Sequence, residues 1–417
     1  MRPAQMDSEA KPTAPTWDDF AAFRGRRFLF AAGHFDFFSG AERQAVFFAA
    51  ELVRRLDAHV SFIGWGGNGR FADEIRAVGA RPITFPLNPG IPQWSDRLQL
   101  LKLAAFIRTQ LRPEFLLPYV WMHCRVIGAI WRLTGAGFCW WNQRDEGRGI
   151  RRTWLERRLM RTLPAVVSNS WEGRDFLTKA FALPESRVRV VNNGVAIPAE
   201  GRDHRWRQKL GIAEDAFVVT MLANLTSFKD HLTLLKAFSA SCQQCIDRNQ
   251  QLVLAGSHED TTDSIRSLAV ELGIADRVHL PGSVRDTEGL LRSTDLVVHS
   301  SVTEGCPNGV LEPMSLGLPV LGTNISGLRQ ALGQPRAVRC LSDPGDWADL
   351  GQRIAHRVVD ARLRDDEGRQ NRQRILEHFS TDMMARQSLD VIRTAIGGLR
   401  SDQRRKPAER TSSSRSE

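Results

Sequence analysis

Short apolar runs and longer amphipathic stretches alternate along most of the chain. Residues 28–32, 59–65 and 115–121 are runs of the first kind, and residues 41–55 place apolar side chains at the spacing of one helical face. Such alternation predicts parallel strands joined by helices. The pattern starts afresh after residues 196–209, which are polar and contain a proline and a glycine. We therefore predict two doubly wound α/β domains joined by a linker.

The clearest strand–loop–helix–strand unit of the second half lies at residues 295–323. A β-branched run is followed by a loop, by a helix that we expect Asn308 to cap, and by a stop at Gly317. Glu304 lies in the loop and Glu312 on the helix. Ligands of parallel sheets bind outside the carboxyl ends of the strands, and a helix N-terminus favours a phosphate. The unit therefore predicts a sugar-nucleotide pocket, whose two carboxylates accept hydrogen bonds from sugar hydroxyls.

The composition is that of an ordinary globular protein with a basic surplus. The 417 residues carry 57 lysines and arginines against 47 aspartates and glutamates, a formal net charge of +10. This charge suits an anionic partner: a nucleotide sugar, an anionic membrane surface or nucleic acid. No apolar run approaches the ~18–20 residues of a membrane span, and the first residues lack a signal-peptide core. We therefore expect a cytoplasmic protein. A peripheral contact with the inner face of the cytoplasmic membrane is compatible with this expectation.

Six cysteines are scattered along the chain, which argues against a disulfide framework. Cys242 and Cys245 form a C-x-x-C pair, but the pair lies late in a helical pattern and has no second pair to complete a zinc site. Cys306 stands out by position alone, because it lies in the same loop as Glu304. We expect neither a metal site nor a redox pair.

The letters EGCPNGVLE, followed by PMSLGLPV, resemble the E-x7-E signature of the retaining glycosyltransferases of family 4, also called glycosyl transferases group 1. Enzymes of that family have the two-domain GT-B fold. The resemblance implies that Glu304 lies beside the donor sugar and that Glu312 binds the ribose hydroxyls. It also implies that the helix start at Asn308 and Gly309 faces the donor diphosphate.

The turn SGAER, which opens the first long helix, is similar to the GGxER turn of the same family. The similarity implies that the turn at Gly40 faces the donor diphosphate and the acceptor. Ser39 stands where the family often has its first glycine. A strand, a glycine-containing turn and a helix also form an anion site on physical grounds, and a plain tight turn is the alternative interpretation.

The segment at residues 223–231 resembles the family's GRLxxxKG motif and, more closely, its ANFxxxKDH variants. The resemblance implies that Lys229 holds the donor diphosphate. Asn224 stands in the position of the family's arginine, so one cation is missing and a neutral hydrogen bond is expected in its place. The loop that contains Val284 corresponds to the one whose backbone meets the base.

Gln143, Arg144 and Asp145 follow a predicted strand and so lie at its carboxyl end. The family commonly places an acceptor-side histidine here, and this chain has none. We expect one of these three residues to face the acceptor, and a solvated turn is the alternative. His34 and His123 are candidates from other segments to replace the histidine.

Residues 147–161 are dense in arginine, with Trp154, Leu155 and Leu159 interleaved. As a helix, this segment has a basic face and an apolar side. One interpretation is a solvated charge run that packs through Leu155 and Leu159. The other is a surface that docks on anionic lipid headgroups or on an anionic acceptor.

Composition predicts the disordered ends and the linker, and the resemblance assigns roles to the domains between them. In the first half we expect a disordered N-terminus at residues 1–16, an N-terminal Rossmann-like acceptor domain at 17–195 and the linker at 196–209. In the second half we expect a C-terminal Rossmann-like nucleotide-sugar donor domain at 210–385, with its last strand at 337–341, a terminal helix crossing back to the first domain at 386–397, and a disordered basic tail at 398–417.

The sequence thus predicts a retaining glycosyltransferase of the hexosyltransferase type, which moves a sugar from a nucleoside-diphosphate sugar to a glycan or lipid-linked glycan acceptor. The family analogy implies work in cell-surface polysaccharide, lipopolysaccharide or glycolipid synthesis. It also implies Lys229 and Glu304 as the catalytic residues and no metal or other cofactor. The alternatives are a GT-B sugar-nucleotide epimerase and a non-catalytic nucleotide-sugar-binding subunit. A nucleic-acid binder would rest on charge alone and has no recognition motif.

Overall fold

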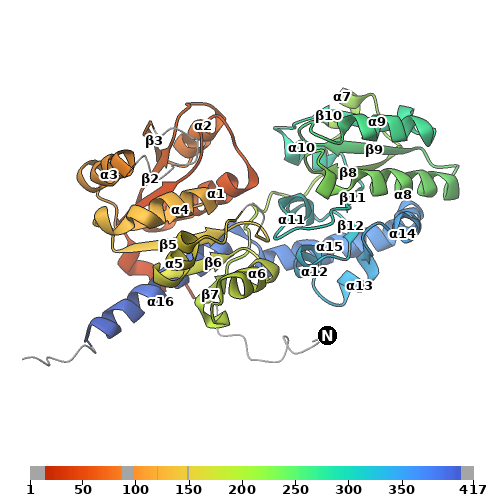
Figure 1. The fold of residues 1–417 in the computed structure, drawn as a ribbon. Helices are drawn as coiled ribbons and strands as arrows, with labels where there is room; N and C mark the ends of the chain where they lie inside the picture. The colour runs from red at the N-terminus through yellow and green to blue at the C-terminus, as the bar shows by residue number, and fades with distance from the viewer. Residues whose placement is uncertain (1–14, 87–96, 120, 148–149, 405–417) are drawn as a thin grey trace, which may run out of the picture.

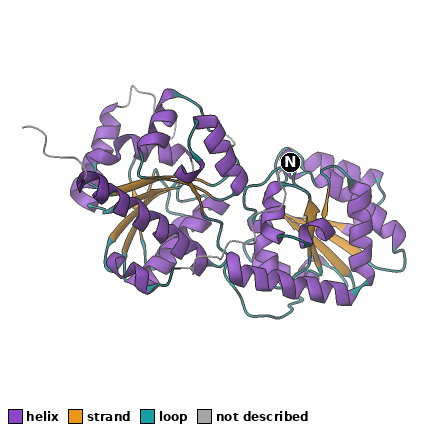
Figure 2. Cartoon of the chain, turned by 90° about the horizontal axis from the view of Figure 1, so that it is seen from below, coloured by secondary structure: helices purple, strands orange, loops and turns teal. Residues whose placement is uncertain are grey.

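The structure, a computed structural model, describes residues 15–86, 97–119, 121–147 and 150–404. Two α/β domains lie beside each other and are joined by a short connection (Figure 1). Each domain is built around one parallel sheet with helices packed on both of its faces (Figure 2). The predicted class, two doubly wound Rossmann-like domains, is confirmed.

The first domain holds a seven-stranded parallel sheet in the order β3-β2-β1-β4-β5-β6-β7. Its inner strand β1 pairs with β2 on one side and β4 on the other, so that Phe30 lies beside Phe62 and Leu117. The strands are β1 (Arg27–Ala31), β2 (His59–Gly64), β3 (Arg81–Thr84), β4 (Phe115–Pro118), β5 (Phe138–Gln143), β6 (Ala165–Ser168) and β7 (Val188–Val190).

Two hydrophobic layers cover this sheet because successive side chains of a strand point to opposite faces. Phe28 and Phe30 of β1 pack with α1, α2 and α16, whereas Leu29 and Ala31 pack with α3 to α6. The helices and short helical turns are η1 (Asp18–Phe23), α1 (Gly40–Leu56), α2 (Arg70–Ala77), α3 (Arg97–Phe106), the π-helix η3 (Ile107–Leu111), α4 (Trp121–Ile130), η4 (Trp131–Leu133), α5 (Trp154–Thr162), α6 (Trp171–Phe181) and η5 (Glu185–Arg187).

The second domain holds a six-stranded parallel sheet in the order β10-β9-β8-β11-β12-β13. Its strands are β8 (Phe217–Leu222), β9 (Gln250–Ala255), β10 (Val278–Gly282), β11 (Leu296–His299), β12 (Val320–Thr323) and β13 (Leu341–Ser342). The short strand β11 is buried along its whole length, as expected for the centre of a parallel sheet.

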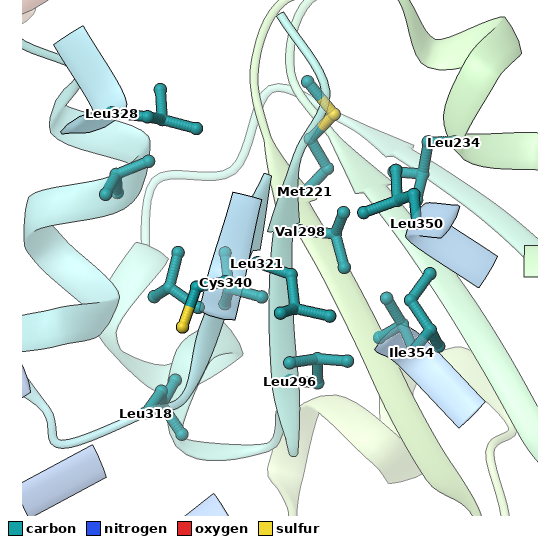
Figure 3. Packing of buried hydrophobic residues seen from close by; sticks show 14 of the residues in the cluster. Met221, Leu234, Leu296, Val298, Leu318, Leu321, Leu328, Cys340, Leu350 and Ile354 are labelled. Atoms are coloured by element: carbon teal, nitrogen blue, oxygen red, sulfur yellow. The ribbon is translucent and has the colours of Figure 1, made fainter. Parts of the chain in front are cut away.

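Helices close both faces of the second sheet. Figure 3 shows Leu350 and Ile354 of α14 packed near Leu296 and Val298 of β11. The helices and turns are α7 (Arg205–Leu210), η6 (Ser227–Lys229), α8 (His231–Gln244), α9 (Thr262–Glu271), η7 (Ala275–Arg277), α10 (Thr287–Arg292), α11 (Asn308–Ser315), α12 (Ser326–Leu332), α13 (Arg336–Cys340), α14 (Trp347–Val359), α15 (Ala361–His378) and α16 (Thr381–Arg404).

The helix α16 follows the second domain in sequence but packs against the first (Figure 1). Its side chains Met384, Ala385, Leu389 and Ile392 are buried in the same hydrophobic layer as α1. The helix begins beside the connection between the domains, where the Thr381 N–H donates to the Val195 carbonyl over 3.3 Å. Helix α16 therefore links the end of the second domain to the first domain, next to the connection between them.

The structure differs in detail from three sequence expectations about local structure. Residues 337–340 belong to helix α13, because Ala337 and Cys340 are buried three positions apart while Val338 is exposed, and the last strand, β13, begins only at Leu341. The predicted linker contains helix α7, whose Trp206 is buried against the second domain. Helix α16 continues through residues 398–404, which were expected to be disordered.

Two other predicted elements are present, but they are shorter than expected. The strand expected at residues 115–121 ends at Pro118, and the basic helix expected at 147–161 begins at Trp154 as α5. Residues 1–14 and 405–417, which make up most of the expected disordered ends, lie outside the described residues. In the described part of the chain, no helix has both the length and the apolar character needed to cross a bilayer.

Candidate active site between the domains

Two neighbouring cavities lie where α1 of the first domain faces the start of α11 in the second. The inner cavity has a volume of about 310 Å³ and the outer cavity about 540 Å³. Both are lined by Gly40, Leu222, Asn308 and Gly309, so they form one continuous cleft. The cleft lies at the carboxyl ends of β8 and β11, next to which the strand order of the second sheet reverses. This is the position where doubly wound sheets bind ligands.

The start of α11 points into the cleft without a side-chain cap. Pro307 occupies the N-cap position and Asn308 is the first helical residue, so the prediction that Asn308 caps the helix is wrong. The Asn308 Oδ1 instead accepts from Asn193 Nδ2 over 2.8 Å and from Gln44 Nε2 over 3.3 Å. Because no side chain caps α11, its first backbone N–H groups are available to an anion.

Two glycines allow the elements around the cleft to approach closely. A Cβ on Gly309 would lie 2.4 Å from the Leu222 carbonyl oxygen, and a Cβ on Gly40 would lie 2.9 Å from Asn308 Nδ2. Ser39, just before Gly40, begins α1 with a capping box that it shares with Glu42. Glycine at these two positions therefore brings α1, β8 and α11 to one point.

Glu304 lies at the bottom of the inner cavity and accepts three hydrogen bonds at Oε1. Lys229 Nζ forms an ion pair with this oxygen, His299 Nε2 lies 2.8 Å from it, and Ser301 Oγ lies 3.0 Å from it. Among the described residues, none donates a hydrogen bond to Glu304 Oε2. One carboxylate oxygen is thus held by the protein, and the other is left for a ligand.

The electrostatic state of this cluster follows from its burial. Burial opposes the ionisation of Glu304, but the hydrogen bond from His299 and the charge of Lys229 outweigh it and hold the pKa of this carboxyl far below its usual range. Burial also lowers the pKa of His299, which is therefore neutral at pH 7. The cluster is a carboxylate, a lysine and a neutral imidazole.

Arg144 brings a second cation to the inner cavity from the first domain. Its guanidinium donates to Asn193 Oδ1 over 2.9 Å and lies over the Tyr119 ring, 5.3 Å from the ring centroid. Its Nε is buried and has no partner among the described residues. Asn193 in turn donates to the Cys306 carbonyl over 2.7 Å. The inner cavity thus has Arg144 on one side and Lys229 on the other.

Glu312 lines the outer cavity and is already engaged across the cleft. Its Oε1 forms an ion pair with Arg43 Nη1, although the two residues belong to different domains. Among the described residues, none donates a hydrogen bond to Glu312 Oε2. A diol that binds Glu312 would therefore use Oε2 or displace Arg43.

Asn224 and Val284 also line the outer cavity. Asn224 Nδ2 donates to Glu259 Oε1 over 2.9 Å, so this side chain is tied to the chain that follows β9. The structure therefore brings together nine of the predicted residues in one cleft. They are Gly40, Arg144, Asn224, Lys229, Val284, Glu304, Asn308, Gly309 and Glu312.

Gln143 and Asp145 do not line either cavity. The buried Gln143 forms a hydrogen bond with Asp145, and Asp145 Oδ1 also accepts from the Gly147 N–H over 2.8 Å. The two side chains thus shape the turn that presents Arg144. His34, paired with Asp36, and the buried His123, packed against Trp65, also lie outside both cavities.

Four residues of the site escaped the sequence interpretation: Arg43, Gln44, Asn193 and His299. The roles of the first three depend on partners that are far away in sequence, as the Arg43–Glu312 and Gln44–Asn308 contacts show. His299 could have been predicted as a site residue, because it is a titratable residue at the carboxyl end of a predicted strand. Arg43 could have been predicted as well, since it ends the SGAER turn.

Comparison with known protein families matches both halves of the chain. Residues 203–374 match the model of glycosyl transferases group 1, and residues 38–197 match that of glycosyltransferase family 4. The chain belongs to the group 1 glycosyltransferases. Together the two matches take in most of the chain and both sides of the cleft.

Curated relatives of this group 1 chain align over part of their length. One is the UDP-Gal:alpha-D-GlcNAc-diphosphoundecaprenol alpha-1,3-galactosyltransferase of Escherichia coli, 25% identical over 42% of this chain and 46% of the relative. Another is the D-inositol 3-phosphate glycosyltransferase of Paenarthrobacter aurescens (strain TC1), 26% identical over 62% of this chain and 63% of the relative. The chain thus spans about half to two-thirds of these relatives.

Solved structures establish the fold of this group 1 chain. Anabaena HepE in complex with UDP and glucose superposes with a TM-score of 0.75 at 18% identity, over 88% of this chain and all of that one. The two sheets and the cleft between them are those of the GT-B fold. In the described part of the chain, no group of three or more His, Cys, Asp or Glu side chains is placed to hold a metal ion.

Proposed function

We propose that this protein is a retaining glycosyltransferase that transfers a hexosyl group from a nucleoside-diphosphate sugar to a glycan or lipid-linked glycan. The observation that supports this most directly is the inner cavity. There, Lys229, Glu304 and the uncapped start of α11 converge from the donor-type domain, and Arg144 faces them from the other domain. The names of the curated relatives, which include a UDP-galactose transferase, support the donor class.

The donor is proposed to lie along the cleft with its nucleoside in the outer cavity and its sugar in the inner one. The ribose hydroxyls donate to Glu312, and the backbone near Val284 meets the base. The diphosphate lies at the first N–H groups of α11, where the helix dipole and Lys229 both favour negative charge. Glu304 Oε2 accepts from a hydroxyl of the transferred sugar, because Oε1 is already held by the protein.

The transfer step breaks the bond between the anomeric carbon and the diphosphate oxygen and forms a bond from that carbon to the acceptor oxygen. The acceptor proton passes to the departing phosphate oxygen on the same face of the sugar, which retains the anomeric configuration. Negative charge grows on the diphosphate as it leaves. A preorganised donor aimed at such a charge is worth about 10²–10³ in rate, roughly 3–4 kcal/mol.

No metal ion is proposed in this step. Lys229, the start of α11 and Arg144 supply positive charge from the protein itself. Asn224 stands where the family motif has an arginine, and its amide already donates to Glu259. Arg144 is therefore the side chain we propose to restore the second cation, from the opposite wall of the cleft.

The acceptor is proposed to enter from the side of the first domain, and a lipid carrier would place the protein at the inner face of the cytoplasmic membrane. Helix α5 supports this, because Trp154 is 68% exposed and Arg157, Arg158 and Arg161 are exposed beside it. An amphipathic helix with arginines and a tryptophan suits an anionic lipid surface. The relative that acts on a diphosphoundecaprenol acceptor supports work in cell-surface polysaccharide, lipopolysaccharide or glycolipid synthesis.

A metal-free calorimetric panel tests the donor assignment. UDP, GDP, ADP and TDP, with their common sugars, are titrated into the protein with EDTA present. We expect one nucleotide family to bind, and we expect Lys229→Ala and Glu312→Ala to weaken binding roughly tenfold each, since each removes a hydrogen bond to a charged group. Lys236→Ala, an exposed lysine on α8, is the matched control.

Two outcomes contradict the proposal. Equal binding by Lys229→Ala and Lys236→Ala would remove the diphosphate role of Lys229. Tight binding of a nucleotide sugar, followed by epimerisation of that sugar in the absence of any acceptor, would replace transfer by epimerase chemistry. Product analysis by NMR distinguishes the two reactions, because only transfer requires an acceptor.

A further inference from the structure

A third cavity lies on the opposite edge of the first domain from the cleft. It has a volume of about 650 Å³, larger than either cavity of the cleft. It is lined by the residues that precede β1, β4 and β5, so it lies at the amino ends of these strands. Ligands of doubly wound sheets normally bind at the other edge, so this cavity is not part of the donor site.

Arginines dominate the polar lining of this cavity. Two carboxylates, Asp19 and Glu114, accompany them, and Glu114 is paired with Arg26 over 2.7 Å. The chain brings the arginines together from the start of β1, from the π-helix η3 and from α16. The five arginines are Arg26, Arg27, Arg108, Arg112 and Arg393, and we refer to this site as the arginine cavity.

Arg108 and Arg112 are the cations of the arginine cavity that lack an acidic partner. Within the described ranges, no carboxylate lies within 4.0 Å of either guanidinium. Arg112 donates through Nε to the Thr109 carbonyl over 3.2 Å, which leaves its two terminal nitrogens uncommitted. Guanidinium groups in this state are matched to phosphate, which they bind through paired hydrogen bonds.

Arg112 ends the helical segment before β4 in a left-handed backbone conformation. Its φ of 46° and ψ of 49° are left-handed, a conformation that glycine adopts with less strain. Arg112 directly follows the π-helix Ile107–Leu111, and π-helical turns occur frequently at functional sites.

We propose that the arginine cavity binds a phosphate-bearing anion, whose phosphate is held by Arg108 and Arg112 with Arg27 and Arg393 nearby. The volume is that of a small-molecule site and exceeds what inorganic phosphate alone would fill. The edges of Phe23, Phe115 and Ile396 give the rest of the ligand an apolar wall. A free organic phosphate and a lipid phosphate headgroup share this chemistry.

The test uses the full chain carrying Lys229→Ala, so that the donor cleft contributes little phosphate binding. Inorganic pyrophosphate is titrated by calorimetry, and sedimentation is measured with phosphatidylcholine vesicles that do or do not contain phosphatidic acid. Arg112→Gly and Arg108→Gln each remove one cation. Arg362→Gln, an exposed arginine on α15 that lies outside both the cavity and α5, controls for net charge.

Arg112→Gly keeps the test independent of folding. Glycine relieves the left-handed backbone, so the melting temperature should stay the same or rise. We expect Arg112→Gly and Arg108→Gln to lose about tenfold in affinity each, and Arg362→Gln to bind as the parent does. If the two cavity variants lose binding to pyrophosphate, the ligand is a free phosphate compound. If they lose binding only to the phosphatidic acid vesicles, the ligand is a lipid headgroup.

The proposal is overturned by either of two results. One is the absence of binding in both the pyrophosphate and the phosphatidic acid arms. The other is equal binding by Arg112→Gly and Arg362→Gln, which would mean that general positive charge attracts the probe. Neither result bears on the donor cleft, whose panel uses the parent chain and other variants.

Discussion

A glutamate that is buried in a protein normally becomes harder to ionise, yet Glu304 is held in its charged form. The cause is local: three donors converge on one of its oxygens, and one of them belongs to Lys229. The charge is therefore set before any donor sugar arrives. The same arrangement keeps Lys229 close to the start of α11, where we propose the leaving diphosphate to lie.

Buried histidines give the protein an acid-sensitive stability. Burial lowers the pKa of both His123 and His231 to about 4, from 6.5 in an exposed side chain. The unfolded chain therefore binds more protons than the folded one between pH 6.5 and 4, and the free energy of unfolding falls as the pH drops through this window. Each histidine contributes at most on the order of 3 kcal/mol.

Urea unfolding at pH 7.5 and pH 5 measures this loss. We expect the loss to be smaller in His123→Gln and in His231→Gln than in the parent, while the control His59→Gln, an exposed histidine, keeps the parent's pH dependence. Glu304 acts in the opposite range, since its lowered pKa supplies stability above about pH 4.5 that is lost only at lower pH. A parent-like difference in both buried-histidine variants would contradict the prediction.

Single residues could be predicted where a short motif carries them, and could not where the fold supplies the partner. Lys229, Glu304 and Glu312 belong to local patterns, and the structure places all three on the cleft. Asn308 was expected to cap its own helix, but partners more than a hundred positions away hold its side chain instead. Local propensity alone does not contain such a contact.

At the scale of elements, the unit β11–α11 carries the proposed chemistry, and its position depends on close backbone contact. Gly309 lies in the first turn of α11, against the last residue of β8. This contact fixes where the helix N-terminus points. Any side chain at this position has to push the helix away from the strand.

Gly309→Ala is therefore expected to damage the donor site. The new Cβ would lie 2.4 Å from the Leu222 carbonyl oxygen, which forces α11 to shift. We expect a loss of about 1–3 kcal/mol in the free energy of unfolding, as for an overpacked core, and weaker nucleotide binding. Gly397→Ala on α16, where a Cβ meets no atom within 4 Å, is the matched control and should not lower stability. Unchanged nucleotide affinity in a folded Gly309→Ala protein would count against the role of this helix start.

The same scale shows why most elements could be predicted and a few could not. Buried strands such as β11 can be recognised in the sequence from β-branched runs between turn residues. Helix α13 could not be recognised, because Val338 and Leu341 suggest a strand while the buried pair Ala337 and Cys340 follows helical spacing over a single turn. A segment of five residues is too short for periodicity to decide.

At the scale of the whole molecule, α16 makes the stability of the first domain depend on residues that follow the second. Leu389 is fully buried in the layer that also holds Phe30 and Phe48. Its removal therefore opens a cavity in a domain whose other residues come from the first half of the chain.

Leu389→Ala should destabilise the first domain selectively. The expected cost is about 2–5 kcal/mol, the usual range for truncating a buried leucine. Hydrogen exchange measured by mass spectrometry should show faster exchange in peptides of β1 and β5 than in those of β8 and β11. Thr394→Ala, an exposed position on the same helix, should change neither. Equal acceleration in both domains would show instead that the two unfold as one unit.

The path of α16 also bears on how the protein is made. A ribosome completes residues 27–190, which hold every strand of the first sheet, long before it reaches Thr381. Until α16 emerges, the face of that sheet which Met384 and Ile392 later cover stays open to water. The nascent first domain therefore waits, with part of its apolar surface exposed, while the entire second domain is synthesised. During this interval, chaperones that recognise exposed apolar segments can bind the uncovered face of the first sheet.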